Sequence, residues 1–314
     1  MIRLLATLGG KGTWVLFFGI FIGLLVPQLA ALFRPLLAPT VVLLLLAMML
    51  RVRWRAAADY ARRPLVIGGL VLWLLVGSPV VTWVVMTWLD LPPSLETAIV
   101  LMSAAPPILA ATSITALLGL DSALAIVSSL LCSFLVPLTL PLLALTLLGL
   151  ELEVAVADLM LRLAAIVALA GAGAALLSRW LGDGWLKTYA THIDGFVVVM
   201  MLVFAVAVMD GVTATLLERP LLVLGWLAAA FLVNPILQLL GGLAFWRLGR
   251  RVALTIGLLT GFRNMGLVLA ALPAGSDSEV ALYLAVAQIP MYMLPAMTLP
   301  AYRRLLAATA ADGR

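Results

Sequence analysis

Long apolar runs make up most of this chain, and short stretches with charges, glycine or proline separate them. A transmembrane helix needs about 20 consecutive, mostly apolar residues. Cut at the polar stretches, the sequence predicts ten transmembrane helices, near residues 13–33, 36–50, 64–89, 94–119, 122–148, 156–178, 191–213, 221–246, 252–273 and 280–301. Because the connections between them are short, we expect a single transmembrane unit over residues 1–314.

Composition supports an all-α membrane protein. Of the 314 residues, 65% are hydrophobic and 11% charged, whereas soluble domains have about 45–50% apolar and about 25% charged residues. These values argue against a soluble enzyme, a disordered regulator and a nucleic-acid binder. One cysteine and one histidine cannot build a metal site, which usually takes four ligands. We therefore expect no enzymatic activity, no cofactor, and no partner beyond a small molecule and membrane lipid.

Basic residues sort to one side of the predicted helices. Fifteen of the 19 lie on the side that holds both termini, while Arg34, Arg162 and Arg219 lie on the other side and Arg263 falls inside the ninth helix. Cytoplasmic loops carry the excess of Lys and Arg in membrane proteins. We expect both termini in the cytoplasm and the protein in a bacterial inner membrane.

The prolines suggest an internal repeat of residues 1–150 and 151–314. Three pairs share nearly the same offset: Pro79 and Pro235 (156), Pro137 and Pro290 (153), and Pro141 and Pro295 (154). Five helices per half is an odd number, so the second half would enter the membrane from the opposite face. Inverted repeats of this kind are typical of secondary transporters. The alternative is chance, because proline is frequent in transmembrane helices.

Two of the predicted helices contain sequences that should break them. Pro106 and Pro107 remove two successive backbone donors from the fourth helix. Gly261 and Gly266 flank Arg263 and Asn264 in the ninth. The repeat offset places Pro107 opposite Arg263. We predict two broken helices that cross near the bilayer midplane, where transporters place their substrates.

Arg263 is the most informative single residue. A charge at the bilayer centre costs at least about 2.5 kcal/mol and marks a functional site by default. One hypothesis is that Arg263 holds a substrate carboxylate or sulfonate with two parallel hydrogen bonds. The alternative is structural, because carbonyls freed at the helix breaks could accept from its five donors.

Other polar residues inside the predicted helices are candidates for the same site. With Arg263, the predicted substrate-binding residues are Asn264, Thr112, Ser113, Thr260, Asn234 and Gln238; the predicted ion-binding residues are Ser129, Thr115 and Ser128; the predicted helix breaks are at Pro106, Pro107 and Gly261. A structural role remains open for each hydroxyl, because Ser and Thr in membrane helices commonly bond to their own helix. Gln288 is a further polar residue, in the tenth helix, with no role assigned.

At these positions the chain resembles the bile acid:sodium symporter family, part of a larger group with arsenite and auxin-efflux carriers. The likeness covers roughly the third to tenth predicted helices. It rests on Ala105-Pro106-Pro107 followed by Asp121-Ser122-Ala123-Leu124, on Val233-Asn234-Pro235 with Leu239-Leu240-Gly241, and on Thr260-Gly261-Phe262-Arg263-Asn264-Met265-Gly266-Leu267. The resemblance implies ten helices in a panel and a core domain, with the fourth and ninth crossing at their breaks.

The chain departs from this family where the family binds sodium. Leu259 replaces a glutamate, Arg263 a glutamine, Thr112 an asparagine and Ala125 a serine, while Asn264 and the hydroxyl of Ser129 remain. A fixed cation close to a sodium ion is unfavourable, by about 4 kcal/mol at about 4 Å and an effective dielectric constant of about 20. We therefore expect degenerate sodium coupling, with Arg263 in place of the ion.

Three functional hypotheses follow. The first is a secondary transporter of an organic anion that works by alternating access with little or no sodium coupling. The second is a conventional sodium-coupled symporter of bile acid-like anions, with its ion ligands at other positions. The third is a sensor or scaffold without transport, in which Arg263 is a structural clamp.

Overall fold

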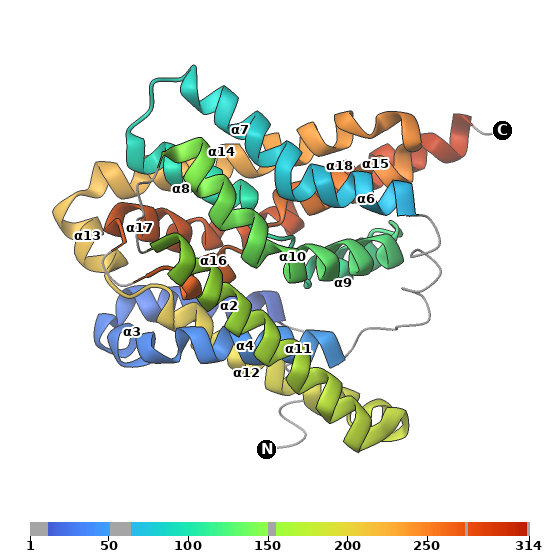
Figure 1. The fold of residues 1–314 in the computed structure, drawn as a ribbon, viewed down its shortest axis with the longest axis horizontal. Helices are drawn as coiled ribbons and strands as arrows, with labels where there is room; N and C mark the ends of the chain where they lie inside the picture. The colour runs from blue at the N-terminus through green and yellow to red at the C-terminus, as the bar shows by residue number, and fades with distance from the viewer. Residues whose placement is uncertain (1–11, 51–63, 150–154, 274–275, 313–314) are drawn as a thin grey trace.

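The computed structural model describes residues 12–50, 64–149, 155–273 and 276–312, and these residues form helices joined by short connections. Two layers are visible in Figure 1. The first layer contains α2 (Gly12–Leu25), α3 (Pro27–Phe33), η2 (Arg34–Leu36), α4 (Leu37–Leu50), α11 (Ala155–Thr188) and α12 (Ala190–Ala207), with contacts of α12 to α2 and of α4 to α11 and α12. A short helix, α13 (Val212–Glu218), leads from this layer to the next.

The second layer holds the remaining helices. These are α6 (Pro64–Leu72), η3 (Trp73–Gly77), α7 (Ser78–Thr87), α8 (Pro93–Ala104), α9 (Ala111–Leu117), α10 (Ser122–Leu148), α14 (Pro220–Ala244), η4 (Trp246–Leu248), α15 (Arg250–Gly261), α16 (Met265–Ala271), α17 (Ser278–Val286) and α18 (Gln288–Asp312). Contacts of α14 with α15, of α7 with α8 and of α8 with α17 hold it together, and α10 contacts α11 of the first layer.

Length and apolar character identify an integral membrane protein. Six helical stretches in the described residues are long and apolar enough to span a bilayer, and a bent pair within 278–306 makes up to seven. Helices occupy all ten predicted segments, but the breaks leave α8, α9, α15 and α16 at 7 to 12 residues each. Such short pieces fall below the roughly 20 residues of a span. Ten spans and the inverted repeat therefore stay predictions.

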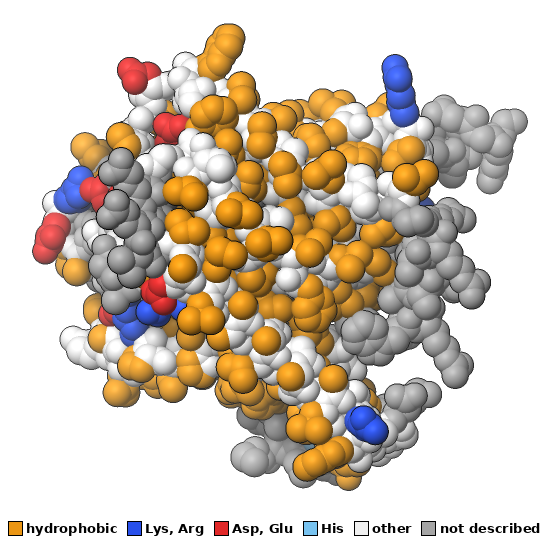
Figure 2. Space-filling view, viewed as in Figure 1, with side chains coloured by type: hydrophobic (Ala, Val, Ile, Leu, Met, Phe, Trp, Pro, Cys, Tyr) orange, Lys and Arg blue, Asp and Glu red, His pale blue; other side chains and the backbone are white. Residues whose placement is uncertain are grey.

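Charged side chains gather at the ends of the helices, away from the apolar flank. Figure 2 shows Asp and Glu at the end of the molecule where α3 and α13 lie, while apolar side chains cover the middle of this face. At the acidic end Arg34 pairs with Asp210 at 2.9 Å, and Arg219 pairs with Glu279 at 2.6 Å. This segregation agrees with a membrane-spanning orientation. The basic segments before residue 12 and at 51–63, used to orient the chain, lie outside the described residues.

The tightest packing joins α14 and α15. A Cβ atom on Gly257 would lie 2.5 Å from the Gln238 carbonyl oxygen, and one on Gly261 would lie 2.7 Å from the Asn234 carbonyl oxygen. Real Cβ atoms essentially never approach other heavy atoms so closely. These glycines therefore let the two backbones touch, and this contact positions the break that follows Gly261.

Candidate functional site

Both predicted helix breaks are present, and they meet. α8 ends at Ala104 and α9 begins at Ala111, while α15 ends at Gly261 and α16 begins at Met265. Between them an isolated antiparallel β-bridge joins Pro107 to Arg263. Its bonds run from the Ile108 N–H to the Phe262 carbonyl (2.9 Å) and from the Asn264 N–H to the Pro106 carbonyl (2.8 Å). The pairing of Pro107 with Arg263 matches the residue offset found in the sequence.

The guanidinium of Arg263 lies fully buried beside this bridge, with 0% of the residue exposed. Its Nε donates to the Thr260 carbonyl at 2.7 Å. Nη1 donates to the carbonyls of Leu74 (2.8 Å) and Ala105 (2.9 Å), and Nη2 donates to the Ser78 hydroxyl at 2.9 Å. Four of the five guanidinium N–H groups thus have protein acceptors. We call this group of contacts the Arg263 clamp.

Each carbonyl in the clamp is free for a reason that the sequence explains. In the π-helical turn Trp73–Gly77 the Ser78 N–H bonds to the Trp73 carbonyl, five residues back. The next bond in that register would run from residue 79 to the Leu74 carbonyl, but residue 79 is proline and has no N–H. The Leu74 carbonyl is therefore left for Arg263.

The other two carbonyls are free because the helices end. Ala105 has an extended backbone (φ −60°, ψ 149°) and is followed by two prolines. The helix therefore does not continue to residue 109, whose N–H would otherwise donate to the Ala105 carbonyl. The Thr260 carbonyl would accept from Asn264 in a continuous helix, but the Asn264 N–H bonds across the bridge instead. Arg263 thus satisfies acceptors at the ends of two broken helices and at a π-helical turn of a third.

This arrangement bears on the two hypotheses for Arg263. Its contacts are those of the structural alternative, in which freed carbonyls neutralise the charge. Direct contact of Arg263 with a substrate anion stays a prediction. Two parallel hydrogen bonds to an anion would require the guanidinium to give up one of its present acceptors. Only one of its five N–H groups has no acceptor among the described residues.

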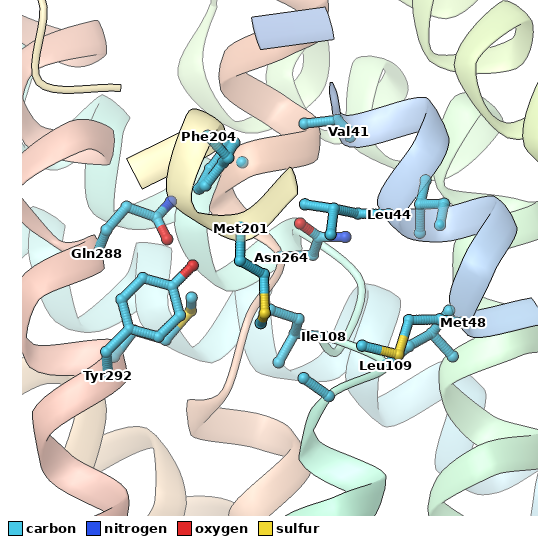
Figure 3. A pocket seen from close by; sticks show the side chains of 14 residues that line it. Val41, Leu44, Met48, Ile108, Leu109, Met201, Phe204, Asn264, Gln288 and Tyr292 are labelled. Carbon is cyan, nitrogen blue, oxygen red and sulfur yellow. The ribbon is translucent and has the colours of Figure 1, made fainter. Parts of the chain in front are cut away.

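A cavity of about 50 Å³ lies between the two layers, next to the crossing. Figure 3 shows side chains from α4, α12, the break after α8, α16 and α18 around it. Its lining residues are Val41, Leu44, Leu45, Met48, Ile108, Leu109, Ala110, Met201, Phe204, Asn264, Gly266, Gln288, Met291 and Tyr292. The cavity is therefore apolar except for two amides and one phenol, and none of its lining side chains is charged.

The three polar side chains of the cavity are incompletely paired. Gln288 is fully buried, its Nε2 makes a long contact of 3.4 Å to the Leu284 carbonyl, and its Oε1 has no partner among the described residues. The Asn264 Oδ1 accepts from the Leu267 N–H at 3.1 Å and caps α16. Tyr292 lies one helical turn after Gln288, and Figure 3 shows its hydroxyl turned toward the cavity. A ligand here would meet hydrogen-bonding groups that the protein leaves free.

Three of the predicted substrate residues lie elsewhere, around the α14–α15 contact. The Asn234 amide bonds back to its own helix at 2.9 Å. Gln238 accepts from the Tyr302 hydroxyl at 2.9 Å, and Thr260 accepts from the Trp73 indole at 3.2 Å. None of the three lines the cavity. The contacts of Gln238 and Thr260 join helices of the second layer, and a role of the three residues in substrate binding stays a prediction.

The predicted hydroxyl residues fall into two groups. The hydroxyls of Thr112 and Thr115 each donate to a carbonyl three residues earlier at 2.7 Å. The hydroxyls of Ser128 and Ser129 on α10 are buried, without a hydrogen-bond partner among the described residues. The side chain of Ser113 is outside the described residues. Of all the predicted substrate residues, Asn264 is the one that lines the cavity.

The polar pair on α18 is not part of the site predicted from the sequence. Gln288 stands out as a polar residue in an apolar helix without an assigned role, and Tyr292 is not among the predicted site residues. A signal existed, because residues four apart lie on the same face of a helix. Gln288 and Tyr292 are the polar members of one such face, which continues the cavity wall through Met291.

A polytopic helical protein with two broken, crossing helices beside an apolar cavity has the features of a membrane transporter. Residues 38–219 match the model of the family described as the Sodium Bile acid symporter family. The match covers 182 of the 314 residues, so the chain belongs to this family. It is therefore a transporter-family membrane protein and not a member of an enzyme family. No curated protein matches the chain.

The family match ends before the ninth predicted helix. Arg263, Asn264, Gln288 and Tyr292 all lie beyond residue 219. The family assignment thus rests on α4 to α13, and what the crossing does in this chain has to be argued from its own contacts.

Proposed function

We propose that this protein is a secondary transporter that moves an organic anion by alternating access, and that the guanidinium of Arg263 takes the place of a coupling sodium ion. Family membership supports transport of this general kind. The cavity supports alternating access, because α4 and α12 line it from the first layer and α16 and α18 from the second. Substrate release from this position requires the two layers to part.

The Arg263 clamp is the observation that carries the proposal on coupling. Transporters coordinate sodium with backbone carbonyls at unwound helix segments. In this protein three such carbonyls and one hydroxyl accept from a guanidinium within 2.7–2.9 Å. A sodium ion does not fit this oxygen set while Arg263 holds it, since the donors already occupy the acceptors and the like charges repel.

The substrate is proposed to bind beside the clamp, in the cavity of about 50 Å³. This cavity would have to widen as the two layers part, because small-molecule sites usually measure about 300–1,000 Å³. Apolar walls favour a largely apolar body, while Asn264, Gln288 and Tyr292 would bind its polar group. Arg263 would act on an anion mainly through its positive field, which is strong where water is excluded. This assigns Asn264 a direct contact and Arg263 an electrostatic role.

Ligand-induced thermal stabilisation of the detergent-purified protein tests the proposal, because a ligand that binds only the folded state raises its apparent stability. A panel of taurocholate, octanoate, benzoate and ethanesulfonate would be measured in sodium and in potassium chloride. We expect at least one anion to stabilise the protein equally in both salts. Stabilisation by sodium alone, or of the anion complex in sodium only, would overturn the proposal on coupling.

Replacement of Arg263 gives a sharper test of whether its guanidinium takes the place of a sodium ion. In Arg263→Gln the carbonyls of Leu74, Ala105 and Thr260 lose their cationic donor, so sodium can enter. We expect this variant to melt at a lower temperature than wild type and to recover part of the loss in sodium over choline. Arg263→Lys is the matched control, since its retained charge should leave stability independent of sodium. Equal salt response of all three proteins would refute the substitution of arginine for sodium.

A conventional sodium symporter is the second candidate, and one observation favours it. The hydroxyls of Ser128 and Ser129 are buried and unpaired among the described residues, which leaves oxygen atoms for an ion away from the clamp. If sodium binds there, wild type is stabilised by sodium and Ser129→Ala loses this effect. The third hypothesis, a scaffold without transport, is tested by measuring whether proteoliposomes that contain the protein take up a panel anion that binds. Uptake would exclude the scaffold and support the two transporter hypotheses.

A further inference from the structure

A long apolar groove lies on the outside of the molecule where the two layers meet. It encloses about 790 Å³, within the range of about 300–1,000 Å³ that is usual for small-molecule sites. The end of α4 borders it through Met49 and Leu50, α10 contributes Phe134 and Pro137, and α11 forms its floor. In Figure 1, α11 runs diagonally across the front of the molecule. Ala164, Ala168 and Ala172 on this helix are exposed, so the groove lies on the outer surface.

The groove exists because α11 presents small side chains along one face. Ala164, Ala168, Gly171, Ala172 and Ala175 recur at helical spacing and all line it. Side chains of this size leave a depression between the neighbouring helices. A Cβ on Gly171 would lie 3.2 Å from the Phe134 ring, so this ring of α10 packs closely against the α11 backbone.

The groove is longer than one leaflet of a bilayer is deep. From Ala164 to Arg179 the helix advances by 15 residues, or about 22 Å at about 1.5 Å per residue. The hydrocarbon part of one leaflet is about 15 Å deep, half of about 30 Å. An acyl chain can thus lie along the groove from the level of Ala164 to the level of Arg179.

Polar and aromatic residues mark the headgroup level at one end. Ser178 and Arg179 line the groove there, and no ion pair of Arg179 occurs within the described residues. Trp180 follows directly with 76% of its surface exposed, and Trp185 stacks on Tyr189 at 4.5 Å between ring centroids. Exposed Trp and Tyr residues concentrate at membrane–water interfaces. Arg179 therefore lies at the depth of lipid phosphates, directly above an apolar groove.

We propose that this groove binds an anionic phospholipid, with one acyl chain along α11 and the phosphate at Arg179 and Ser178. A cation at the end of an apolar groove matches the charged headgroup and apolar chain of a lipid. A second copy of the chain is less favourable, because its apolar surface would cover Arg179. The sequence places Arg179 on the cytoplasmic side, where anionic lipids supply a negative surface potential. Because the groove is lined by α10 as well as by α4 and α11, the bound lipid would bridge the two layers.

The test compares lipids that differ only in the headgroup. The delipidated full-length protein in detergent would be titrated with dioleoyl phosphatidylglycerol, with dioleoyl phosphatidylcholine and with glycerol 1-phosphate, and apparent Kd values taken from thermal shifts and from native mass spectrometry. We expect phosphatidylglycerol to bind several times more tightly than phosphatidylcholine, and glycerol 1-phosphate to have no effect. Equal Kd values for the two phospholipids would overturn the proposal, and so would binding of glycerol 1-phosphate alone.

Four variants assign the effect to the groove. Arg179→Gln should raise the Kd for phosphatidylglycerol about fivefold, the usual effect of one basic residue near a charged membrane surface. Its control is Arg247→Gln, since Arg247 also adjoins an exposed tryptophan but does not line the groove. Ala172→Leu should weaken both phospholipids by filling the groove, whereas Ala165→Leu, exposed on the same helix but outside the lining, should not. A lipid-free dimer that Ala172→Leu dissociates would refute the proposal in favour of a second copy.

Discussion

The Arg263 clamp and the largely apolar cavity beside it differ in how their buried polar groups are paired. At the clamp, four guanidinium donors meet four acceptors within 2.9 Å. In the cavity, the buried Oε1 of Gln288 has no partner among the described residues. An unpaired buried polar group is costly, so a protein keeps one where something else pairs with it. The difference suggests that the clamp holds the fold and that the cavity receives the ligand.

The largest loss of stability is expected when Arg263 itself is replaced. Arg263→Met leaves three buried carbonyls without their present donors, and each buried acceptor left unsatisfied typically costs about 1–3 kcal/mol. We expect the variant to lose most of its folded yield, measured by size-exclusion chromatography with fluorescence detection and by thermal unfolding. If the variant folds with wild-type stability, the Arg263 clamp does not hold the fold and our division of roles is wrong.

A second prediction concerns the packing that supports the clamp. In Gly257→Ala the new methyl group would lie 2.5 Å from the Gln238 carbonyl oxygen, and overpacking of this kind costs about 1–3 kcal/mol. We expect a clear loss of thermal stability in detergent. Gly225→Ala on α14 is the control, because nothing lies within 4 Å of its added Cβ. Equal melting temperatures of the two variants would show that the α14–α15 contact does not constrain the crossing.

A third prediction tests whether Pro79 is the reason that the Leu74 carbonyl is free to accept from Arg263. Pro79→Ala restores an N–H that can donate to the Leu74 carbonyl in the π-helical register, in competition with Arg263. The net value of one such hydrogen bond is about 1 kcal/mol, so the change in the free energy of unfolding should be small. Hydrogen exchange should instead show a protected amide at residue 79 and weaker protection around residue 264. Unaltered exchange at the crossing would mean that the Leu74 carbonyl contributes little.

The smallest effect on stability is expected in the cavity. Gln288→Leu removes an oxygen that has no protein partner, so thermal stability without ligand should stay within about 0.5 kcal/mol of wild type or rise. Binding of the panel anion identified for the wild type should weaken at least tenfold in the same thermal-shift assay, and Tyr292→Phe should weaken it less. Strong destabilisation with unchanged ligand binding would place Gln288 with the structural groups.

The elements that follow from local sequence were predictable. Pro106, Pro107 and Gly261 mark the breaks because their backbone chemistry excludes a regular helix, and the repeat offset even placed Pro107 opposite Arg263. Apolar runs marked stretches that are helical in the structure. The count of ten spans stays a prediction, because α8, α9, α15 and α16 are individually too short to span a bilayer.

The contacts of the candidate site were harder to predict. Nothing in the sequence shows that residues 73–77 form a π-helical turn, so the third carbonyl of the clamp could not be foreseen. Polarity alone placed Asn234, Gln238 and Thr260 with the substrate, although Asn234 bonds within its own helix and the other two bond to a neighbouring helix. Gln288 carries a similar amide, and it differs from them because an empty space lies beside it, which depends on tertiary packing.

The proline that frees the Leu74 carbonyl also bears on how this crossing could have evolved. Arginine at position 263 is tolerable when position 79 lacks an N–H and position 78 offers a hydroxyl, since the charge then finds acceptors already waiting. Substitutions at the three positions should therefore occur together. Among related chains, those with arginine at the position of 263 should also have proline and serine or threonine at the positions of 79 and 78, and those with glutamine there should vary at both.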